Sequence, residues 1–318
     1  MQQPLLSARL LGITYVFAFL ISSARSWPIW WPPWKGHHGH GDDPGTPDPD
    51  DSWKERNFNT ISSIYNLTVY PHQLPIIQGG GAGVPPGLFS SDVVGRVDPV
   101  GDFVGFEDSI EYFFALSPLP QGNGASSAIT SYKITEFSSA CAGVAASVVY
   151  LFCSVFNPGS PNHGKALAPL KQVAFWRFDE VGAVLKYDAW IPNLNNWVEA
   201  TEAAPITNPQ FQAQSIQVIC AVTQMRCTGV NSQWANIGEC VAALTQKPYG
   251  NYDAAWGDNV VCRSIHLVLT QVRPDVHCPH VGPTGGGKCI NVPYPTDFFS
   301  DESLYGDPVG ETFMCPKD

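Results

Sequence analysis

Residues 173–191 constrain the fold of this chain more than any other stretch, because they read as two strands joined by a tight turn. Apolar and polar side chains alternate on both sides of the turn at 179–182, which is typical of a hairpin with one buried face. If Phe178 faces Ala183 across the turn, one face is almost wholly apolar. That face would consist of Ala174, Trp176, Phe178, Leu185, Tyr187, Ala189 and Ile191. The pattern therefore predicts a sheet with one side turned toward a core.

The first residues of the chain predict export. An apolar run at 10–21 and small residues at 24–26 are typical of a signal peptide covering residues 1–26. The run is shorter than the roughly 20 apolar residues that a membrane-spanning helix needs, so we expect no membrane insertion. Residues 27–51 are rich in Pro, Trp, His and Asp, and we expect a disordered linker there. The linker histidines are either weak copper or nickel ligands or simply solvated; they are His37, His38 and His40.

Charge and cysteine content narrow the class of partner. The net charge of −11 becomes −13 when Arg9 and Arg25 leave with the signal peptide, which argues against nucleic acid as a partner. Nine cysteines in an exported chain indicate disulfide bonds, because the extracellular compartment is oxidising. The sequon at Asn66 predicts N-glycosylation and therefore an exposed position. We expect a secreted, extracellular glycoprotein.

The order of elements before the hairpin predicts an α+β fold. The expected elements are helices at 53–70 and 106–116 and extended segments at 89–104, 129–137 and 144–156. The glycine-rich stretch 79–83 lacks the strand and helix that a phosphate-binding loop requires, so we interpret it as a connector. Glu107, Asp108 and Glu111 lie in the first turns of the second helix. We expect them to stabilise its positive end rather than to form a catalytic pair, because nothing in the sequence buries them.

This arrangement, with GDFVGFEDSIEYFFAL leading into the sheet and FWRFDEVGAVLKYDAWIP closing it, resembles the nuclear transport factor 2-like superfamily and, within it, the SnoaL-like polyketide cyclases. The resemblance covers about half of the chain. It implies a cone-shaped domain over residues 52–205, in which a curved antiparallel sheet wraps on the N-terminal helices around an apolar pocket. Such domains occur in cyclases, isomerases and non-enzymatic binding proteins, so the resemblance implies a fold more than an activity.

Residues 210–292 are expected to form a disulfide-stapled helical cap on the cone, followed by a tail at 293–318. Its expected helices are at 213–225, 232–245 and 253–272. Six cysteines favour three disulfides and leave the pairing open; they are Cys220, Cys227, Cys240, Cys262, Cys278 and Cys289. Cys141 and Cys315 are the expected fourth pair, because Cys153 lies too far along its hairpin to reach Cys141 and is then a buried thiol. The segment 227–289 also resembles a cysteine-rich region of secreted fungal proteins.

Two motifs in this region have functional alternatives. His266, His277 and His280 offer three nitrogen ligands for zinc with one position left open. The spacing also fits a hydrogen-bonded structural cluster in which Cys262 and Cys278 clamp the intervening turn, and we favour that interpretation and expect no cofactor. The stretch 282–288 matches the start of a nucleotide P-loop, but a cysteine follows where the loop needs Ser or Thr, so we expect no nucleotide site.

We expect the cone to bind a small apolar or aromatic molecule without turning it over. Trp176, Phe178, Leu185 and Tyr187 would line the pocket, with the Tyr187 hydroxyl orienting the ligand. Strand parity places Asp188 on the opposite face with cationic neighbours, where surface ion pairing is its expected role.

Two alternatives stay open. One is a cyclase or isomerase that uses Asp188, to which the resemblance directs attention, or His163 as base and Tyr187 as hydrogen-bond donor. The other is an interior filled by Phe and Trp side chains, which would leave the surface as an interaction module. The mixed aromatic and charged face around Trp190 also suits pairing with a second copy, as a homodimer.

Overall fold

The computed structural model describes residues 52–120, 127–202, 205–293, 295–296 and 301–316. The expected signal peptide and the linker with its three histidines lie outside these residues and stay predictions. Within the described residues, no helix is both long and apolar enough to cross a membrane.

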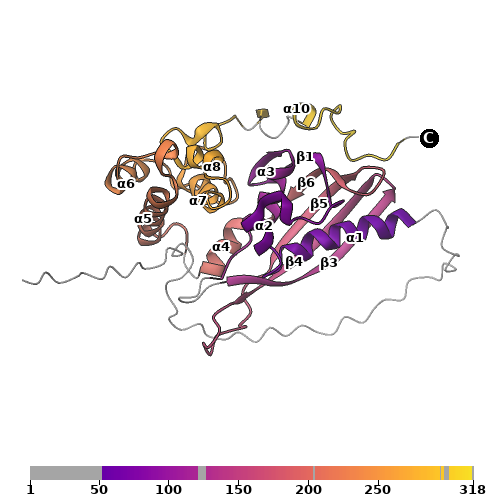
Figure 1. Cartoon of the computed structure of the whole chain (residues 1–318), viewed down its shortest axis with the longest axis horizontal. Coiled ribbons are helices and arrows are strands. Elements are labelled where there is room, and N and C mark those ends of the chain that lie inside the picture. Colours follow the sequence, from indigo (N-terminus) through magenta and orange to yellow (C-terminus); the bar gives the residue numbers. More distant parts are fainter. Residues whose placement is uncertain (1–51, 121–126, 203–204, 294, 297–300, 317–318) are drawn as a thin grey trace, which may run out of the picture.

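A six-stranded sheet forms the centre of the molecule, with the strand order β2-β1-β6-β5-β4-β3 (Figure 1). The strands are β1 (Phe89–Asp98), β2 (Gly101–Val104), β3 (Ser127–Cys141), β4 (Val144–Val155), β5 (Leu170–Phe178) and β6 (Val184–Trp190). The expected extended segment at 89–104 is the hairpin of β1 and β2, which turns at Pro99. The antiparallel pairing expected for the sheet holds for every ladder but one, since β1 and β6 run parallel.

Helices cover one face of this sheet and continue past one of its ends (Figure 1). The helices are α1 (Ser52–Leu67), α2 (Leu74–Gly79), α3 (Phe106–Ile110), α4 (Leu194–Glu202), α5 (Pro209–Arg226), α6 (Ile237–Thr245), α7 (Val260–Leu269), α8 (Pro274–Val281) and α10 (Asp301–Tyr305), with a π-helical turn η2 (Glu111–Ala115) and short 3-10 turns η1 (Gly80–Gly83), η3 (Gly229–Asn231) and η4 (Gly285–Gly287). The expected α+β fold is confirmed. Helices α2, α4, α8 and α10 were not expected; α8 begins at Pro274, and proline suits a first helical position.

Helix α1 is fixed to the sheet at its first turns. The Arg56 guanidinium donates to the carbonyl oxygens of Glu180 and Ala142, each at 2.9 Å, which belong to two different hairpin turns. Further along, Ile61 and Ile64 are fully buried against the sheet. These contacts hold α1 across the sheet, so its last turn reaches the interior.

A β-bulge in the β5–β6 hairpin changes the face that sequence parity predicts. Phe178 pairs with Val184 rather than Ala183, and Arg177 pairs with Lys186, so Leu185 is the extra residue of the bulge. Val184 is fully buried, whereas Leu185 is half-buried. The expectation that Leu185 lines the inner face is therefore wrong. The bulge restores the expected parity beyond it, which keeps Tyr187 inside.

Disulfides organise the helical region and the end of the chain. The bonded pairs are Cys141–Cys315, Cys220–Cys240, Cys227–Cys278 and Cys262–Cys289, and Cys153 is a buried free thiol. The expected Cys141–Cys315 bond and three bonds within the helical region are confirmed. The suggested Cys262–Cys278 clamp is wrong, because α8 turns Cys278 toward Cys227 of α5. A second apolar core of residues between α5 and α8 includes the Cys220–Cys240 and Cys227–Cys278 bonds.

Candidate functional site

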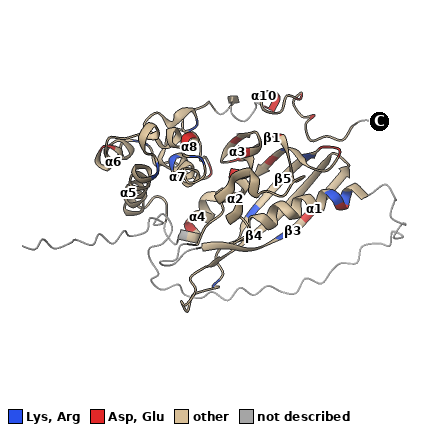
Figure 2. Cartoon of the chain, in the orientation of Figure 1, with Lys and Arg blue, Asp and Glu red and all other residues tan. Residues whose placement is uncertain are grey.

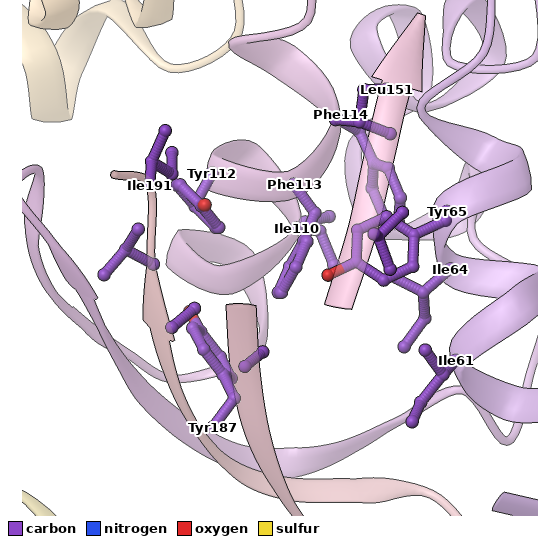
Figure 3. Close-up of a cluster of buried hydrophobic side chains, with 14 of the residues drawn as sticks. Ile61, Ile64, Tyr65, Ile110, Tyr112, Phe113, Phe114, Leu151, Tyr187 and Ile191 are labelled. Carbon is purple, nitrogen blue, oxygen red and sulfur yellow. The ribbon is translucent and has the colours of Figure 1, made fainter. Parts of the chain in front are cut away.

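The inner face of the sheet is closed by aromatic rings from the π-helical turn η2 (Figure 3). Phe113 lies 5.8 Å from the ring of Trp176 and 5.1 Å from the ring of Tyr187. Tyr112 stacks on Tyr187 at 6.4 Å, and Tyr65 of α1 meets Trp176 edge-on at 6.1 Å. The structure thus brings the predicted residues Trp176 and Tyr187 together in the core, where Phe178 is also buried. Sequence reasoning missed the residues of η2, because it assigned them to an ordinary amphipathic helix.

Polar atoms are distributed through this aromatic interior. Gln172 Nε2 donates to the Tyr112 hydroxyl at 2.6 Å, and the Tyr187 hydroxyl donates to Ser109 Oγ at 3.2 Å. Burial raises the pKa of both Tyr112 and Tyr187 well above the ordinary value of tyrosine. Both hydroxyls therefore stay protonated at neutral pH and do not act as bases; the Tyr187 hydroxyl donates, and the Tyr112 hydroxyl accepts from Gln172.

Five buried side chains have polar atoms without a hydrogen-bond partner among the described residues, and two of them belong to α1 and to the segment that follows it. The unpaired atoms of these two are the hydroxyl of Tyr65 and both amide atoms of Gln73. Tyr65 is 1% exposed and Gln73 is fully buried. In Figure 3 the Tyr65 hydroxyl points into the interior, toward Ile110 and Phe113. Because an unpaired buried polar group costs about 1–3 kcal/mol, such groups are uncommon in a finished core.

Asp188 lies on the outer face of the sheet, as strand parity predicts, but it does not face solvent. It is 6% exposed and pairs with Arg96 of β1, with an Nη2–Oδ2 distance of 2.7 Å. Burial raises the pKa of Asp188, and the Arg96 guanidinium opposes that increase. The expected exposed pairing with Lys186 and Arg177 is wrong, because those cations bind the C-terminal segment instead, Lys186 at Asp307 Oδ2 and Arg177 at the Met314 carbonyl oxygen.

The C-terminal segment, residues 301–316, covers this part of the outer face. Asp301 binds Arg96 at 2.8 Å, and the Tyr305 hydroxyl donates to the carbonyl oxygen of Tyr187 at 3.0 Å. The ring of Phe313 lies 6.2 Å from Phe175, whose other neighbour is Trp190. The face around Trp190, expected to suit a second copy, is thus partly occupied by this chain itself.

The remaining sequence candidates lie apart from the interior. His163 is exposed in the loop after β4, where its Nδ1 accepts the backbone N–H of Asn157 at 3.1 Å and its ring meets Phe156. Asn66 is exposed near the end of α1. In the P-loop-like stretch, Lys288 donates to the carbonyl oxygen of Asp102 and Cys289 is disulfide-bonded.

Three histidines of the helical region converge where that region meets α3 and η2. Nδ1 of His266, from α7, lies 3.2 Å from Nδ1 of His277 and 3.2 Å from Nδ1 of His280, both from α8. His277 and His280 are buried, and His266 is half-buried. Burial and the neighbouring histidines lower the pKa of His266 and bring that of His280 to about 4, so both are neutral at pH 7. The structure thus brings the three predicted histidines together.

Glu111 joins this histidine cluster to the sheet domain. Its carboxylate accepts His277 Nε2 at 2.8 Å and the Nε of Arg273 at 2.6 Å, and it is 2% exposed. Arg273 Nη2 also reaches Asp108 Oδ1 at 2.6 Å. Figure 2 shows the acidic positions on α3 and basic ones next to α7. The expectation that Glu111 stays at the helix start without burial is wrong, because a segment some 160 residues later covers it.

Solved structures similar to this chain include members of the group that its sequence resembles. A candidate SnoaL-like polyketide cyclase from Jannaschia is 12% identical, with a TM-score of 0.33, and the match covers 52% of this chain and 100% of that one. A candidate polyketide cyclase from Xanthomonas campestris is 10% identical, with a TM-score of 0.31, covering 47% and 98%.

Curated relatives and family models match a larger part of the chain. Aurasperone B biosynthesis cluster protein A of Aspergillus niger is 33% identical over 214 residues, which is 64% of this chain and 68% of the relative. Bifonsecin B biosynthesis cluster protein A of Aspergillus brasiliensis is 31% identical over 214 residues, or 64% and 70%. Residues 66–189 match the model described as the BfoA N-terminal domain, and residues 177–292 match the BfoA family C-terminal domain. Since both halves match in order, the chain belongs to the BfoA family.

Proposed function

We propose that this chain binds a small, largely aromatic molecule in the interior of the sheet domain and leaves it chemically unchanged. The relatives are described as biosynthesis cluster proteins, which supports a role in handling a small natural product. The interior supplies stacking rings and protonated hydroxyls, and these suit an aromatic molecule with oxygen substituents.

The observation that carries the proposal is the Tyr65 hydroxyl, which is buried among aromatic rings and makes no full hydrogen bond among the described residues, although Ser147 lies near enough to lower its pKa. A carbonyl or hydroxyl group of a ligand would supply that partner. Entry of the ligand requires the Phe113 ring to move from its place between Trp176 and Tyr187. Phe113 belongs to the π-helical turn η2, and such turns occur frequently at functional sites.

The positions of the ionisable groups favour binding over acid–base chemistry. Asp188 and Tyr187 are sequence neighbours on a strand and point to opposite faces of the sheet. His163 is exposed on a loop. A cyclase or isomerase built from these three residues would need its base and its hydrogen-bond donor on one side, within hydrogen-bond reach of one substrate.

The ring contacts of Phe113 favour a second candidate function. If Phe113 never leaves the interior, the sheet domain is a scaffold, and its exposed surface becomes the interacting part. Phe58 of α1, 37% exposed, and Phe152 of β4, 40% exposed, are apolar side chains on that surface.

The test is capture of a compound from an extract of the source organism, followed by mass spectrometry of what the protein retains. We expect one compound retained unchanged by the wild-type protein. Tyr65→Phe should weaken its binding about tenfold, since a hydrogen bond contributes about 1 kcal/mol or somewhat more. Tyr150→Phe, on the half-buried outer side of β4, is the matched control and should bind as the wild type does.

Three results would contradict the binding proposal. Recovery of a chemically altered compound supports the cyclase or isomerase alternative. Retention of nothing by folded protein supports the filled scaffold. Equal binding by Tyr65→Phe and the wild type removes the observation on which the proposal rests.

We also propose that the chain acts outside the cell. Four disulfides support an extracellular location, because disulfides persist in oxidising compartments. Expression of the full chain in a fungal host should place the protein in the medium, with a mass that falls after enzymatic removal of N-glycans. Asn66→Gln should abolish that mass change. Protein that stays in the cell fraction with residues 1–26 intact would contradict secretion.

A further inference from the structure

We propose that His266, His277 and His280 form a zinc site, with one coordination position left for water or for an oxygen atom of a small molecule. The three side chains come from two helices, and their potential ligand atoms all lie within 4.8 Å of one another. Each offers a ring nitrogen, which zinc binds readily. Neither the relatives' names nor the family descriptions assign a metal to this region.

The distances between the nitrogens match tetrahedral coordination. Zinc–nitrogen bonds of about 2.0–2.1 Å at tetrahedral angles separate two ligand nitrogens by about 3.3–3.4 Å. His266 Nδ1 lies 3.2 Å from each of the other two Nδ1 atoms. These two separations are close to the tetrahedral value, and the potential ligand atoms of all three side chains lie within 4.8 Å of one another.

Hydrogen bonding by itself cannot satisfy this cluster. The Nδ1 atom of a neutral imidazole carries either one proton or one lone pair. His266 Nδ1 faces two other Nδ1 atoms, so it cannot make a full hydrogen bond to both. A cation at the centre would accept lone pairs from all three nitrogens at once.

Glu111 orients the ring of His277 for this role. Its carboxylate accepts the Nε2 proton of His277 at 2.8 Å, which leaves the lone pair on Nδ1, toward the other two rings. A carboxylate behind a ligating histidine is the usual second layer of a zinc site. Arg273 fixes both oxygens of Glu111 in turn.

The surrounding residues add no thiolate ligand to the three histidines. Cys262 and Cys289 also lie close to His266, but they are bonded to each other. The backbone of η4 lies against His280, where a Cβ on Gly286 would fall 2.8 Å from the ring. Three nitrogen ligands with a remaining open position is the arrangement of zinc sites that bind an exchangeable fourth ligand.

The test is a zinc titration of chelator-stripped protein in competition with a chromophoric chelator. The parent protein for this test carries no affinity tag. It also carries the substitutions His37→Ala, His38→Ala and His40→Ala, because these three histidines could compete for the metal. We expect one zinc ion per chain and a higher melting temperature on binding. Cobalt in place of zinc should give the intense visible bands of a tetrahedral site.

Variants separate this site from adventitious binding. His277→Ala should abolish stoichiometric binding, and Glu111→Gln should weaken it about 10- to 100-fold, because Glu111 acts through His277. His163→Ala, in an exposed loop, is the matched control and should bind zinc as the parent does. Since loss of His277 also disturbs Glu111, His280→Ala serves as a second ligand variant, and circular dichroism verifies the fold of each.

Two outcomes would overturn the proposal. One is folded, stripped parent protein that takes up no zinc. The other is binding that survives in both His277→Ala and His280→Ala. Both readouts are independent of the small-molecule capture described above, so either proposal can fail without the other.

Discussion

At the scale of single residues, Gly95 makes room for the ring of Tyr187, because glycine has no side chain. Gly95 of β1 pairs with Tyr187 of β6, and the tyrosine ring lies over the glycine backbone. A Cβ added at Gly95 would fall 2.2 Å from Tyr187 Cζ, a separation that two unbonded carbons do not adopt. The glycine thus allows a large ring to lie flat on a neighbouring strand, facing Phe113.

Gly95→Ala tests this packing. Because the ring cannot move without disturbing Trp176 and Phe113, we expect a loss of about 1–3 kcal/mol in the free energy of unfolding, measured by urea denaturation. Gly87→Ala is not a suitable control, since its φ is +83°. Gly143→Ala is suitable, because the nearest atoms to its Cβ are 3.8 Å away, and it should cost less.

Variants of the ion pair between Arg96 and Asp188 test whether Asp188 stabilises the fold or acts on the ligand. Arg96→Ala leaves a buried carboxylate without its main partner, so we expect destabilisation by about 3–5 kcal/mol. The double variant Arg96→Met with Asp188→Leu should recover most of that loss. Ligand retention by the double variant should equal that of the wild type, and a selective loss of retention would indicate that Asp188 acts on the ligand.

Asp258 makes a pH-dependent contribution to stability. Burial raises its pKa, but hydrogen bonds from Lys247 and Arg263 outweigh that effect and bring the pKa below the ordinary value. A lowered folded-state pKa stabilises the fold above the unfolded-state pKa of about 3.9, and this contribution is lost as the pH falls through the folded value. Wild type should therefore exceed Asp258→Asn in unfolding midpoint at pH 6, with a difference that shrinks below about pH 4. A difference that stays constant through that range would contradict the prediction.

At the scale of elements, the C-terminal segment acts as a strap across the outer face of the sheet. Its attachments are the Cys141–Cys315 disulfide at one end and the Asp301–Arg96 pair at the other, with Tyr305 between them. The disulfide closes a loop of 174 residues. Restriction of so long a loop in the unfolded chain stabilises the fold, by about 2–4 kcal/mol for a typical bond.

Removal of the strap's covalent anchor tests its role. The variant Cys141→Ser with Cys315→Ser should lower the unfolding midpoint and expose Phe175 and Trp190, which pack toward Phe313. Limited proteolysis should then cut first within 301–316. Cleavage elsewhere at the earliest times would show that the noncovalent contacts hold the segment without the bond.

At the scale of the whole molecule, two apolar cores lie side by side, and they are stabilised in different ways. The larger core fills the sheet domain, and the smaller one lies among α5–α8 and includes the Cys220–Cys240 and Cys227–Cys278 disulfides. Small cores depend more on covalent links, because they bury less apolar surface. The Arg273–Glu111 and His277–Glu111 contacts join the two parts.

Reduction should therefore affect the two parts unequally. In the presence of a thiol reductant we expect α5–α8 to lose protection from hydrogen exchange at a lower temperature than β4–β6, as measured by mass spectrometry. Simultaneous loss in both parts would show that the interface around Glu111 makes the molecule a single cooperative unit.

Local patterns were sufficient to predict much of this protein. Alternation in residues 173–191 predicted the hairpin and the inward position of Trp176 and Tyr187, because strand side chains alternate whatever lies around them. Helical spacing predicted α1, α5 and α7, and cysteine geometry predicted the Cys141–Cys315 bond.

Contacts between distant segments decided the rest. The burial of Asp188 beneath residues 301–316 and the meeting of Glu111 with His277 join parts of the chain that no local pattern relates. A sequence fixes the face on which a side chain stands through backbone periodicity. What covers that face depends on how the whole chain packs. In this protein, the packing assembled both the aromatic interior and the histidine cluster from segments far apart in the sequence.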